Sequence, residues 1–435
     1  MTEPRPENGG RWRKWPALLV LVLVTCALVL AACGDDDDDD GGSSGDSGGE
    51  TAEQAAADAP TGEPIVTYTI TDVNTQGPQY KNIQETARIY QEWVNANGGI
   101  NGRPLEAKFC DAKGTPTDAA ACARKAVADN AVAVVGNFTF TGDAIVPILD
   151  KAGISYFGNC CALSAAELTT PSVYPMGNQP LYGVGLVKRA VDDGCKNING
   201  VIIEGAEAFK PLLDNAAKNL DTKINKYVTL PATAKDYSAE VAEATDGADC
   251  LVMIVSETPY IAWMPAFAQS GSEARMYGPQ GNLNEKVAEG FEEVTDGDVT
   301  AGMYPDISLP QWDNFRQAIE DYEADPEQDY NSLGGMGTWA AYEGFKQIVE
   351  GMQGEVTKDT FLDAAGKAQI DLPGMVPPLD FTKPWNKDGG PAGFDRLFHR
   401  CVVFSELKDG KLEPLTTEFE DVSELAGGKN PAQCN

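Results

Sequence analysis

The stretch that most constrains the fold runs from Asn95 to Ala144, where turn signals separate short helix and strand patterns. Asn97-Gly98-Gly99 ends a helix, because glycine enters the left-handed backbone conformation at low cost, and Asn101-Gly102 is a second turn signal. A strand is predicted over 105–109, and the residues from 119 to 128 are rich in helix formers. This alternation of strands and helices favours an α/β chain.

An apolar run from Ala131 to Val135 completes this unit. Such a run is typical of a strand buried on both faces of a parallel sheet. It leads into a polar loop, residues 136–142, that opens a further helix. Because ligands of open α/β sheets bind beyond the carboxyl ends of the strands, this loop is the first candidate for a binding site. Thr139 and Thr141 are its candidate ligand contacts.

The sequence NANGGINGRP at 95–104 resembles a motif of the substrate-binding proteins of branched-chain amino acid ABC transporters, the leucine/isoleucine/valine-binding-protein-like family. The order of elements agrees with that family from about Val66 to about Met352. The resemblance implies the α/β fold of type I periplasmic binding proteins, with two lobes, each a mainly parallel sheet flanked by helices, and three crossovers at the hinge. The expected boundaries are 64–178 and 307–365 for lobe 1, and 179–306 and 366–435 for lobe 2.

The resemblance also implies ligand contacts on loops of both lobes. Tyr80 falls where the family has a pocket aromatic, although a surface tyrosine is an equal alternative. Ala162 and Ser164 match the loop that holds the ligand's carboxylate, and helix capping is the alternative role for Ser164. In lobe 2, Phe209 matches a position that is usually an aromatic hydroxyl. The lobe 2 half of the site is expected on residues 204–209, 256–260 and 277–282.

Gln280 departs from the family at a position that affects the charge of the ligand. The segment YGPQG at 277–281 resembles a Gly-Pro-Glu-Gly segment whose glutamate pairs with the ligand's ammonium group, but glutamine is neutral. A buried ammonium without a charged partner is strongly disfavoured. An α-amino acid ligand therefore requires Glu204, Glu207 or Glu257 as a substitute. Otherwise the ligand is an amide, a carboxylic acid or a neutral solute.

The first 63 residues are predicted to form a leader and a tether. Residues 1–32 carry basic residues, an apolar run and a small-residue site before Cys33, typical of a lipoprotein signal peptide that leaves Cys33 lipidated. A transmembrane anchor is the alternative for the apolar run. Residues 33–63 have few large apolar side chains, which predicts a disordered acidic tether. A calcium site is the competing interpretation of its six consecutive aspartates.

Length and charge limit the function classes. About 370 residues remain after the leader and tether, which suits two lobes. A net charge of −33 makes nucleic acid a poor partner. The resemblance implies a monomer without a cofactor, lipid-anchored on the outer face of the cell membrane, that binds a small molecule and delivers it to an ABC permease. A ligand-sensing module that presents its closed form to a signalling receptor is the alternative.

The cysteine content fits an exported protein. Of ten cysteines, Cys26 leaves with the leader and Cys33 takes lipid, and the other eight have 105 possible pairings. Cys160 and Cys161 are expected to pair with each other or, as the alternative, with Cys110 and Cys122. Adjacency of the predicted elements favours Cys110–Cys122, Cys195–Cys250 and Cys401–Cys434. Zinc binding is the competing interpretation, but the sequence has no CxxC and one histidine.

Catalysis is not expected. The single histidine, His399, lies in a strand-like run and is expected to be structural, so neither a metalloprotease motif nor a Ser-His-Asp triad has support. GxSxG occurs only within the tether, where no elbow is expected. Trp339 and Tyr342 are expected in the core of lobe 1. After Asp371, short strands near 398–404 and 412–415 are expected to close lobe 2.

Overall fold

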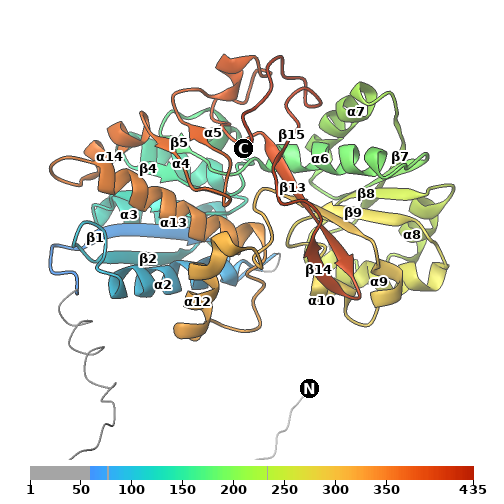
Figure 1. Cartoon of the computed structure of the whole chain (residues 1–435), viewed down its shortest axis with the longest axis horizontal. Helices are drawn as coiled ribbons and strands as arrows, with labels where there is room; N and C mark the ends of the chain where they lie inside the picture. Colours follow the sequence, from blue (N-terminus) through green and yellow to red (C-terminus); the bar gives the residue numbers. More distant parts are fainter. Residues whose placement is uncertain (1–58, 76–77, 233) are drawn as a thin grey trace, which may run out of the picture. The chain divides into compact units, whose positions relative to one another are not determined.

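The computed structural model describes residues 59–75, 78–232 and 234–435. The predictions for the signal peptide, for Cys33 and for the tether up to residue 58 lie outside these residues. The described part contains two separate parallel-sheet cores, each covered by helices (Figure 1). None of its helices is both long and apolar enough to cross a membrane.

The first sheet is parallel, with five strands in the order β2-β1-β3-β4-β5. We call this sheet and its helices lobe 1. Its strands are β1 (Ile65–Thr71), β2 (Leu105–Asp111), β3 (Ala133–Val135), β4 (Ser155–Phe157) and β5 (Val173–Tyr174). Its helices are α2 (Lys81–Ala96), α3 (Pro116–Ala128), α4 (Gly142–Lys151), α5 (Ala165–Thr169), α12 (Asp313–Asp321), α13 (Leu333–Gly351) and α14 (Lys358–Ala365), with the short η2 (Pro310–Trp312) before α12.

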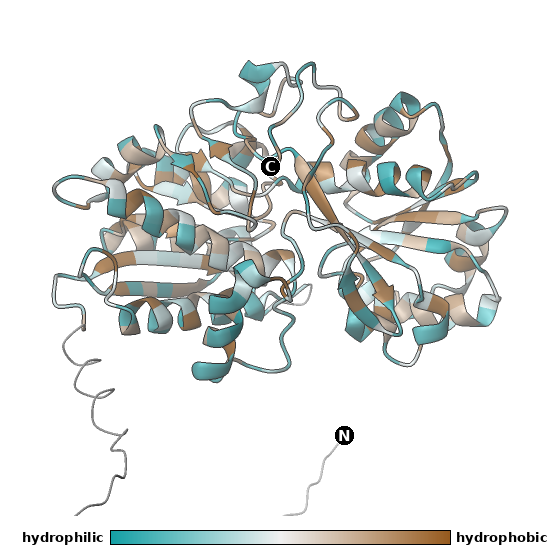
Figure 2. Ribbon diagram, in the orientation of Figure 1, coloured by the Kyte–Doolittle hydropathy of each residue, from teal (hydrophilic) through white to brown (hydrophobic). Residues whose placement is uncertain are grey.

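Alternate residues of β1 face opposite helical layers. Ile70 packs in the apolar cluster formed with α3 and α4. On the other face, the hydroxyl of Tyr342 on α13 lies 2.9 Å from that of Thr69. Trp339 and Tyr342 are fully buried, which confirms the prediction that they belong to the core. Figure 2 shows the apolar residues concentrated on the strands and the hydrophilic ones on the outer helices.

The second sheet has the order β14-β13-β10-β9-β8-β6-β7, with β15 paired to β13, and defines lobe 2. Its middle strands are parallel, and β13, β14 and β15 add antiparallel pairing at one side. Its strands are β6 (Ile198–Ile203), β7 (Ile224–Leu230), β8 (Cys250–Ile254), β9 (Arg275–Pro279), β10 (Val299–Gly302), β13 (Cys401–Lys408), β14 (Lys411–Pro414) and β15 (Glu420–Asp421). Its helices are α6 (Gln179–Asp192), η1 (Glu207–Phe209), α7 (Lys210–Asn219), α8 (Ser238–Thr245), α9 (Glu257–Ser270), α10 (Glu285–Ala288), α11 (Glu292–Thr295) and η3 (Trp385–Asp388).

The C-terminal segment belongs to both lobes. The ribbon of β11 (Gln369–Ile370) and β12 (Leu379–Asp380) packs in the apolar core of lobe 1, as does Phe381. Trp385 and the strand β13 pack in lobe 2. The expected start of lobe 2 at residue 366 therefore lies too early, because the apolar side chains of 370–381 pack in the core of lobe 1.

The chain passes between the lobes near 175–178, near 303–306 and before β13. Two short strands flank these crossovers, β5 and β10, and the sequence did not predict β10. Asn178 joins all three. Its backbone N–H contacts the Met303 sulfur at 2.6 Å, and its side-chain amide donates to His399 Nδ1 at 2.8 Å and to the Cys401 carbonyl at 2.7 Å. One buried amide thus fixes the hinge.

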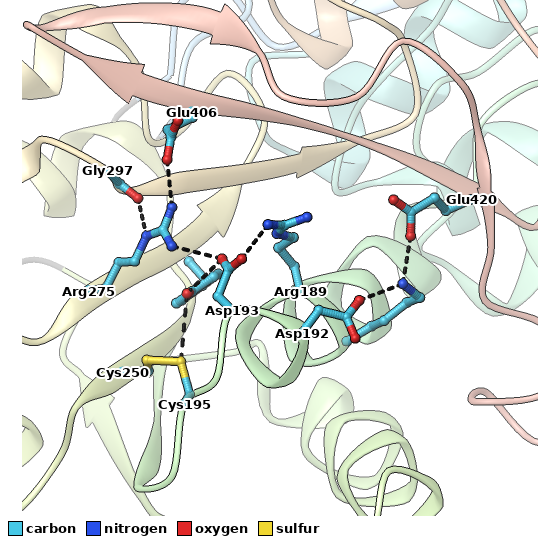
Figure 3. A network of polar contacts seen from close by, with 11 residues as sticks. Arg189, Asp192, Asp193, Cys195, Cys250, Arg275, Gly297, Glu406 and Glu420 are labelled. Carbon is cyan, nitrogen blue, oxygen red and sulfur yellow. Dashed lines mark hydrogen bonds and ion pairs between the residues drawn. A yellow bond between two sulfur atoms is a disulfide. The ribbon is translucent and has the colours of Figure 1, made fainter.

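An ion-pair network attaches β13 to the rest of lobe 2 (Figure 3). The guanidinium of Arg275 on β9 contacts Asp193 and Glu406 at 2.8 Å each. Arg189 pairs with the same Asp193 carboxylate, whose side chain is only 9% exposed. The network connects the end of α6, the strand β9 and the strand β13, which are distant in sequence.

Three of the predicted disulfides are present: Cys110–Cys122, Cys195–Cys250 and Cys401–Cys434. A fourth is not formed in this structure, where Cys160 and Cys161 are free. Their alternative pairing with Cys110 and Cys122 is excluded, since those two sulfurs are bonded to each other.

We expect His399 to make the protein less stable as the pH falls from about 6.5 to about 3. Burial lowers the pKa of His399 from 6.5 to about 3, so the unfolded chain binds the proton more readily within that window. The contribution to stability is complete above pH 6.5 and declines by at most about 1.4 kcal/mol per pH unit below it. Urea unfolding of the wild type and of His399→Gln measures it.

The control is the His399→Gln chain itself, which keeps an acceptor for Asn178 but does not titrate. The difference in unfolding free energy between wild type and variant should fall steadily with acidification. Parallel stability curves between pH 6.5 and pH 4 would show that the ring does not titrate as its burial requires.

Candidate functional site

A cavity of about 900 Å³ lies where loops of both lobes meet. Six of the loops that line it follow β1, β3, β4, β6, β8 and β9, and each of these leaves the carboxyl end of a parallel strand. This is the place where open α/β sheets bind ligands. Residues 327–329, in the loop between α12 and α13, also line it. The first residues of α13 complete the wall.

Aromatic side chains from both lobes line the cavity. In lobe 1 the rings of Tyr80 and Phe138 lie 4.6 Å apart edge-on, and Phe140 lies 5.3 Å from Phe138. In lobe 2 the rings of Tyr182 and Phe209 lie 5.5 Å apart. Phe140 is 58% exposed, which is unusual for so large an apolar side chain and leaves its ring open to a ligand.

Another part of the cavity lining is polar and acidic. The side-chain amide of Asn284 donates to Glu257 Oε2 at 2.8 Å and lies 3.4 Å from Asp329 Oδ2. Glu257 also pairs with Lys286 at 2.9 Å. Burial, and secondarily the charge of Glu257, raises the pKa of Asp329 to about 6, although the contact with Asn284 acts in the other direction. Asn284 therefore connects an acid of lobe 2 with an acid of lobe 1.

Sequence reasoning missed Asp329, because it lies in an irregular loop before α13 with no periodic or motif signal. Four of the eight predicted ligand contacts line the cavity, and four do not. Those that line it are Tyr80, Phe209, Glu257 and Gln280. Those that do not are Thr139, Thr141, Ala162 and Ser164.

The loop after β3 turns its hydroxyl groups away from the cavity. Thr139 is fully buried, and its hydroxyl donates to Asp72 Oδ2 at 2.9 Å. The Thr141 hydroxyl lies 2.8 Å from that of Thr139. Phe138 and Phe140, which alternate with the two threonines, face the cavity instead. The expected anion cradle is therefore replaced here by aromatic surface.

Ser164 caps a helix. Its hydroxyl accepts the Glu167 backbone N–H, and the Glu167 carboxylate in turn accepts the N–H of Ser164 at 2.9 Å, a reciprocal capping box at the start of α5. Burial raises the pKa of Glu167 to about 7. Ala162 is fully buried. The capping alternative for Ser164 is thus confirmed.

Gln280 lines the cavity, but its amide is engaged by the hinge. Its Nε2 donates to the Tyr304 carbonyl at 2.8 Å, and the residue is 5% exposed. Of the three candidate substitutes for the missing glutamate, Glu257 is the one that lines the cavity. Glu204 and Glu207 are exposed and accept backbone N–H groups of Ala232 and Gly205.

Within the described residues, one group of side chains has the proximity of a metal site: Cys195, Asp249 and Cys250. Its two sulfurs are bonded to each other in a disulfide, so they offer no thiolate. The zinc interpretation therefore has no support there. His399 is likewise committed to the hinge through Asn178.

Comparison with known proteins adds a family and a fold. A sequence model of the periplasmic binding protein family matches residues 74–411. Among solved structures, a possible leucine/isoleucine/valine-binding protein from Rhodopirellula baltica SH 1 is similar at TM-score 0.66 and 15% identity, covering 82% of this chain and 97% of that one. A search of curated proteins gives no match.

Two further structures carry other names. A fatty acid ABC transporter substrate-binding protein from Thermomonospora curvata has TM-score 0.69 and 17% identity, covering 87% of this chain and 96% of that one. A solute-binding protein of an R. palustris ABC transporter, in complex with benzoate, has TM-score 0.63 and 19% identity, covering 81% and 95%. At these identities the similarity establishes the fold alone.

The alanine variant Ser164→Ala should destabilise the protein by about 0.5–2 kcal/mol, because it removes the cap of α5. Its affinity for any ligand of the cavity should stay unchanged. Ser256→Ala is the matched control for stability, since Ser256 precedes α9 without a side-chain capping bond. Chemical denaturation compares the three chains. A Ser164→Ala chain as stable as the wild type would contradict the capping role.

Proposed function

The chain belongs to the periplasmic binding protein family, and from that premise we propose that it captures a small solute outside the cytoplasm and delivers it to an ABC permease. The observation that carries this proposal is the cavity of about 900 Å³ at the carboxyl ends of both parallel sheets. A site divided between two lobes binds its ligand by closing around it. Closure about the three crossovers would expel water from the aromatic walls.

The proposed ligand is amphipathic, in the range of a branched-chain amino acid, an amide or a short carboxylic acid. Tyr80, Phe138 and Phe140 on one side and Phe209 on the other offer contacts to an apolar body. Glu257 and Asp329 favour a ligand group that donates hydrogen bonds, such as an amine or amide. A carboxylate placed beside these two acids would be repelled, so we rank amines and amides above acids.

The solved structures with this fold bear names that include branched-chain amino acids, fatty acids and benzoate. Membership of the family thus indicates the class of function, and the residues that line the cavity determine which solute binds. We further propose that Cys33 is lipidated and that the acidic residues after it tether the binding lobes to the outer face of the membrane. Both proposals rest on the sequence.

A thermal-shift panel on the full chain in detergent should identify the ligand class. A solute at about 100 times its Kd stabilises the folded state by about 2.7 kcal/mol. We expect shifts with amino acids or amides that carry a branched or aromatic side chain. The absence of any shift with amino acids, amides and short acids, on a protein that melts cooperatively, would contradict the proposed ligand range.

Charge variants should locate the ligand's donor group. For an amine ligand from the panel, Glu257→Gln and Asp329→Asn should each weaken binding by about 1.5–3 kcal/mol, roughly ten- to a hundredfold in Kd. Glu204→Gln and Glu207→Gln are matched controls, because these glutamates lie outside the cavity lining. Isothermal titration measures the four affinities. Equal losses in controls and test variants would refute the assignment.

A further inference from the structure

Cys160 and Cys161 are the two cysteines of the described chain that carry free thiols, while the other six form three disulfides. Their sulfurs lie 2.7 Å apart. Both residues line the solute cavity, although they are only 4% and 3% exposed. The proposed binding function gives these thiols no role.

We propose that Cys160 and Cys161 are a reversible oxidation site in the wall of the cavity, converted to a vicinal disulfide by exchange with an external disulfide. One protein thiolate attacks the external disulfide, which releases one thiol and leaves a mixed disulfide. The thiolate of the neighbouring cysteine then attacks the protein sulfur of the mixed disulfide, which releases the second half of the external disulfide as a thiol. Two protein thiols lose two hydrogen atoms, and the external disulfide gains them as two thiols.

The geometry would make a disulfide between Cys160 and Cys161 more easily reduced than the three existing disulfides. Adjacent Cα atoms lie about 3.8 Å apart across a trans peptide, whereas disulfides usually span about 4.4–6.8 Å. The three existing disulfides span 5.6, 6.0 and 5.8 Å, within that range. A bond between adjacent cysteines is therefore strained, and strained disulfides are the labile ones.

The surroundings of Cys160 connect the pair to the hinge. A Cβ atom on Gly177, in the first crossover, would lie 1.6 Å from the Cys160 carbonyl oxygen. A Cβ on Gly337 of α13 would lie 2.7 Å from the Cys160 Cβ and 3.0 Å from the hydroxyl of Tyr304, in the second crossover. Both positions thus require glycine because the packing is close. A change of conformation at Cys160 would therefore displace neighbouring residues at two crossovers.

Access to the pair is through the cavity. Burial, and then the neighbouring Cys160 thiol, raises the pKa of Cys161 well above its usual value. A protonated thiol is a poor nucleophile, so exchange is expected to be slow. Because the walls of the cavity are also the proposed solute site, a bound solute and an exchange reagent would compete for the same space.

The test equilibrates the full chain in glutathione buffers from fully reduced to fully oxidised. After acid quenching, denaturation and alkylation, mass spectrometry reads the peptide that contains both cysteines. In reduced buffer we expect two labels on this peptide. In oxidised buffer we expect no label and a mass lower by two hydrogen atoms, while the six cysteines of the three disulfides stay unlabelled throughout. Two labels in every buffer, or conversion only together with the other three disulfides, would overturn the proposal.

The single variants Cys160→Ser and Cys161→Ser serve as matched controls. Each lacks the second thiol, so the mixed disulfide should persist as one glutathione adduct on the remaining cysteine. Absence of the adduct on both variants would contradict the proposal that an external disulfide reaches these thiols through the cavity. Unlabelled structural disulfides and an unchanged thermal midpoint show that each variant is folded. No solute is needed, so the result is independent of whether the proposed transport function holds.

Discussion

The hydrogen bonds of Asn178 set the geometry on which the cavity depends. Its amide binds His399 and the Cys401 carbonyl, and its backbone N–H contacts Met303, so three chain segments far apart in sequence meet at one residue. All of these groups are buried, where a polar atom without a partner is costly. The loops that line the cavity come from both lobes, so their separation depends on the segments where the chain crosses between the lobes. The hinge is therefore a polar junction within apolar surroundings.

The sequence predicted the fold well wherever the signal is local. The strand predicted over 105–109 lies within β2, and the helix formers from 119 to 128 lie within α3. The strand β8 alternates between two apolar clusters, as a run buried on both faces should. The strand β10 was missed because it has only four residues, two of which, Ala301 and Gly302, are poor strand formers. Its place is set by pairing with β9 and with β13. Such pairing is a tertiary property that no local pattern contains.

The site was predicted at the level of loops and less well at the level of side chains. A family resemblance transfers a position along the chain, but the direction of a side chain depends on local competition for hydrogen bonds. The Thr139 hydroxyl donates to the buried carboxylate of Asp72, and the Ser164 hydroxyl caps the N-terminus of α5. Phe138 and Phe140 then supply the surface that faces the cavity. Asp329 could not be found from the sequence, since it meets Asn284 only after the two lobes have assembled.

The replacement at Gln280 follows from the same hinge. Its amide donates to the Tyr304 carbonyl within the second crossover and is almost fully buried. A glutamate there would place a charge against a carbonyl oxygen without a donor, which is strongly disfavoured. Two acidic groups of the cavity, Glu257 and Asp329, lie one on each lobe, with Asn284 between them. A ligand group held there would contact both lobes at once, and its binding would favour the closed arrangement directly.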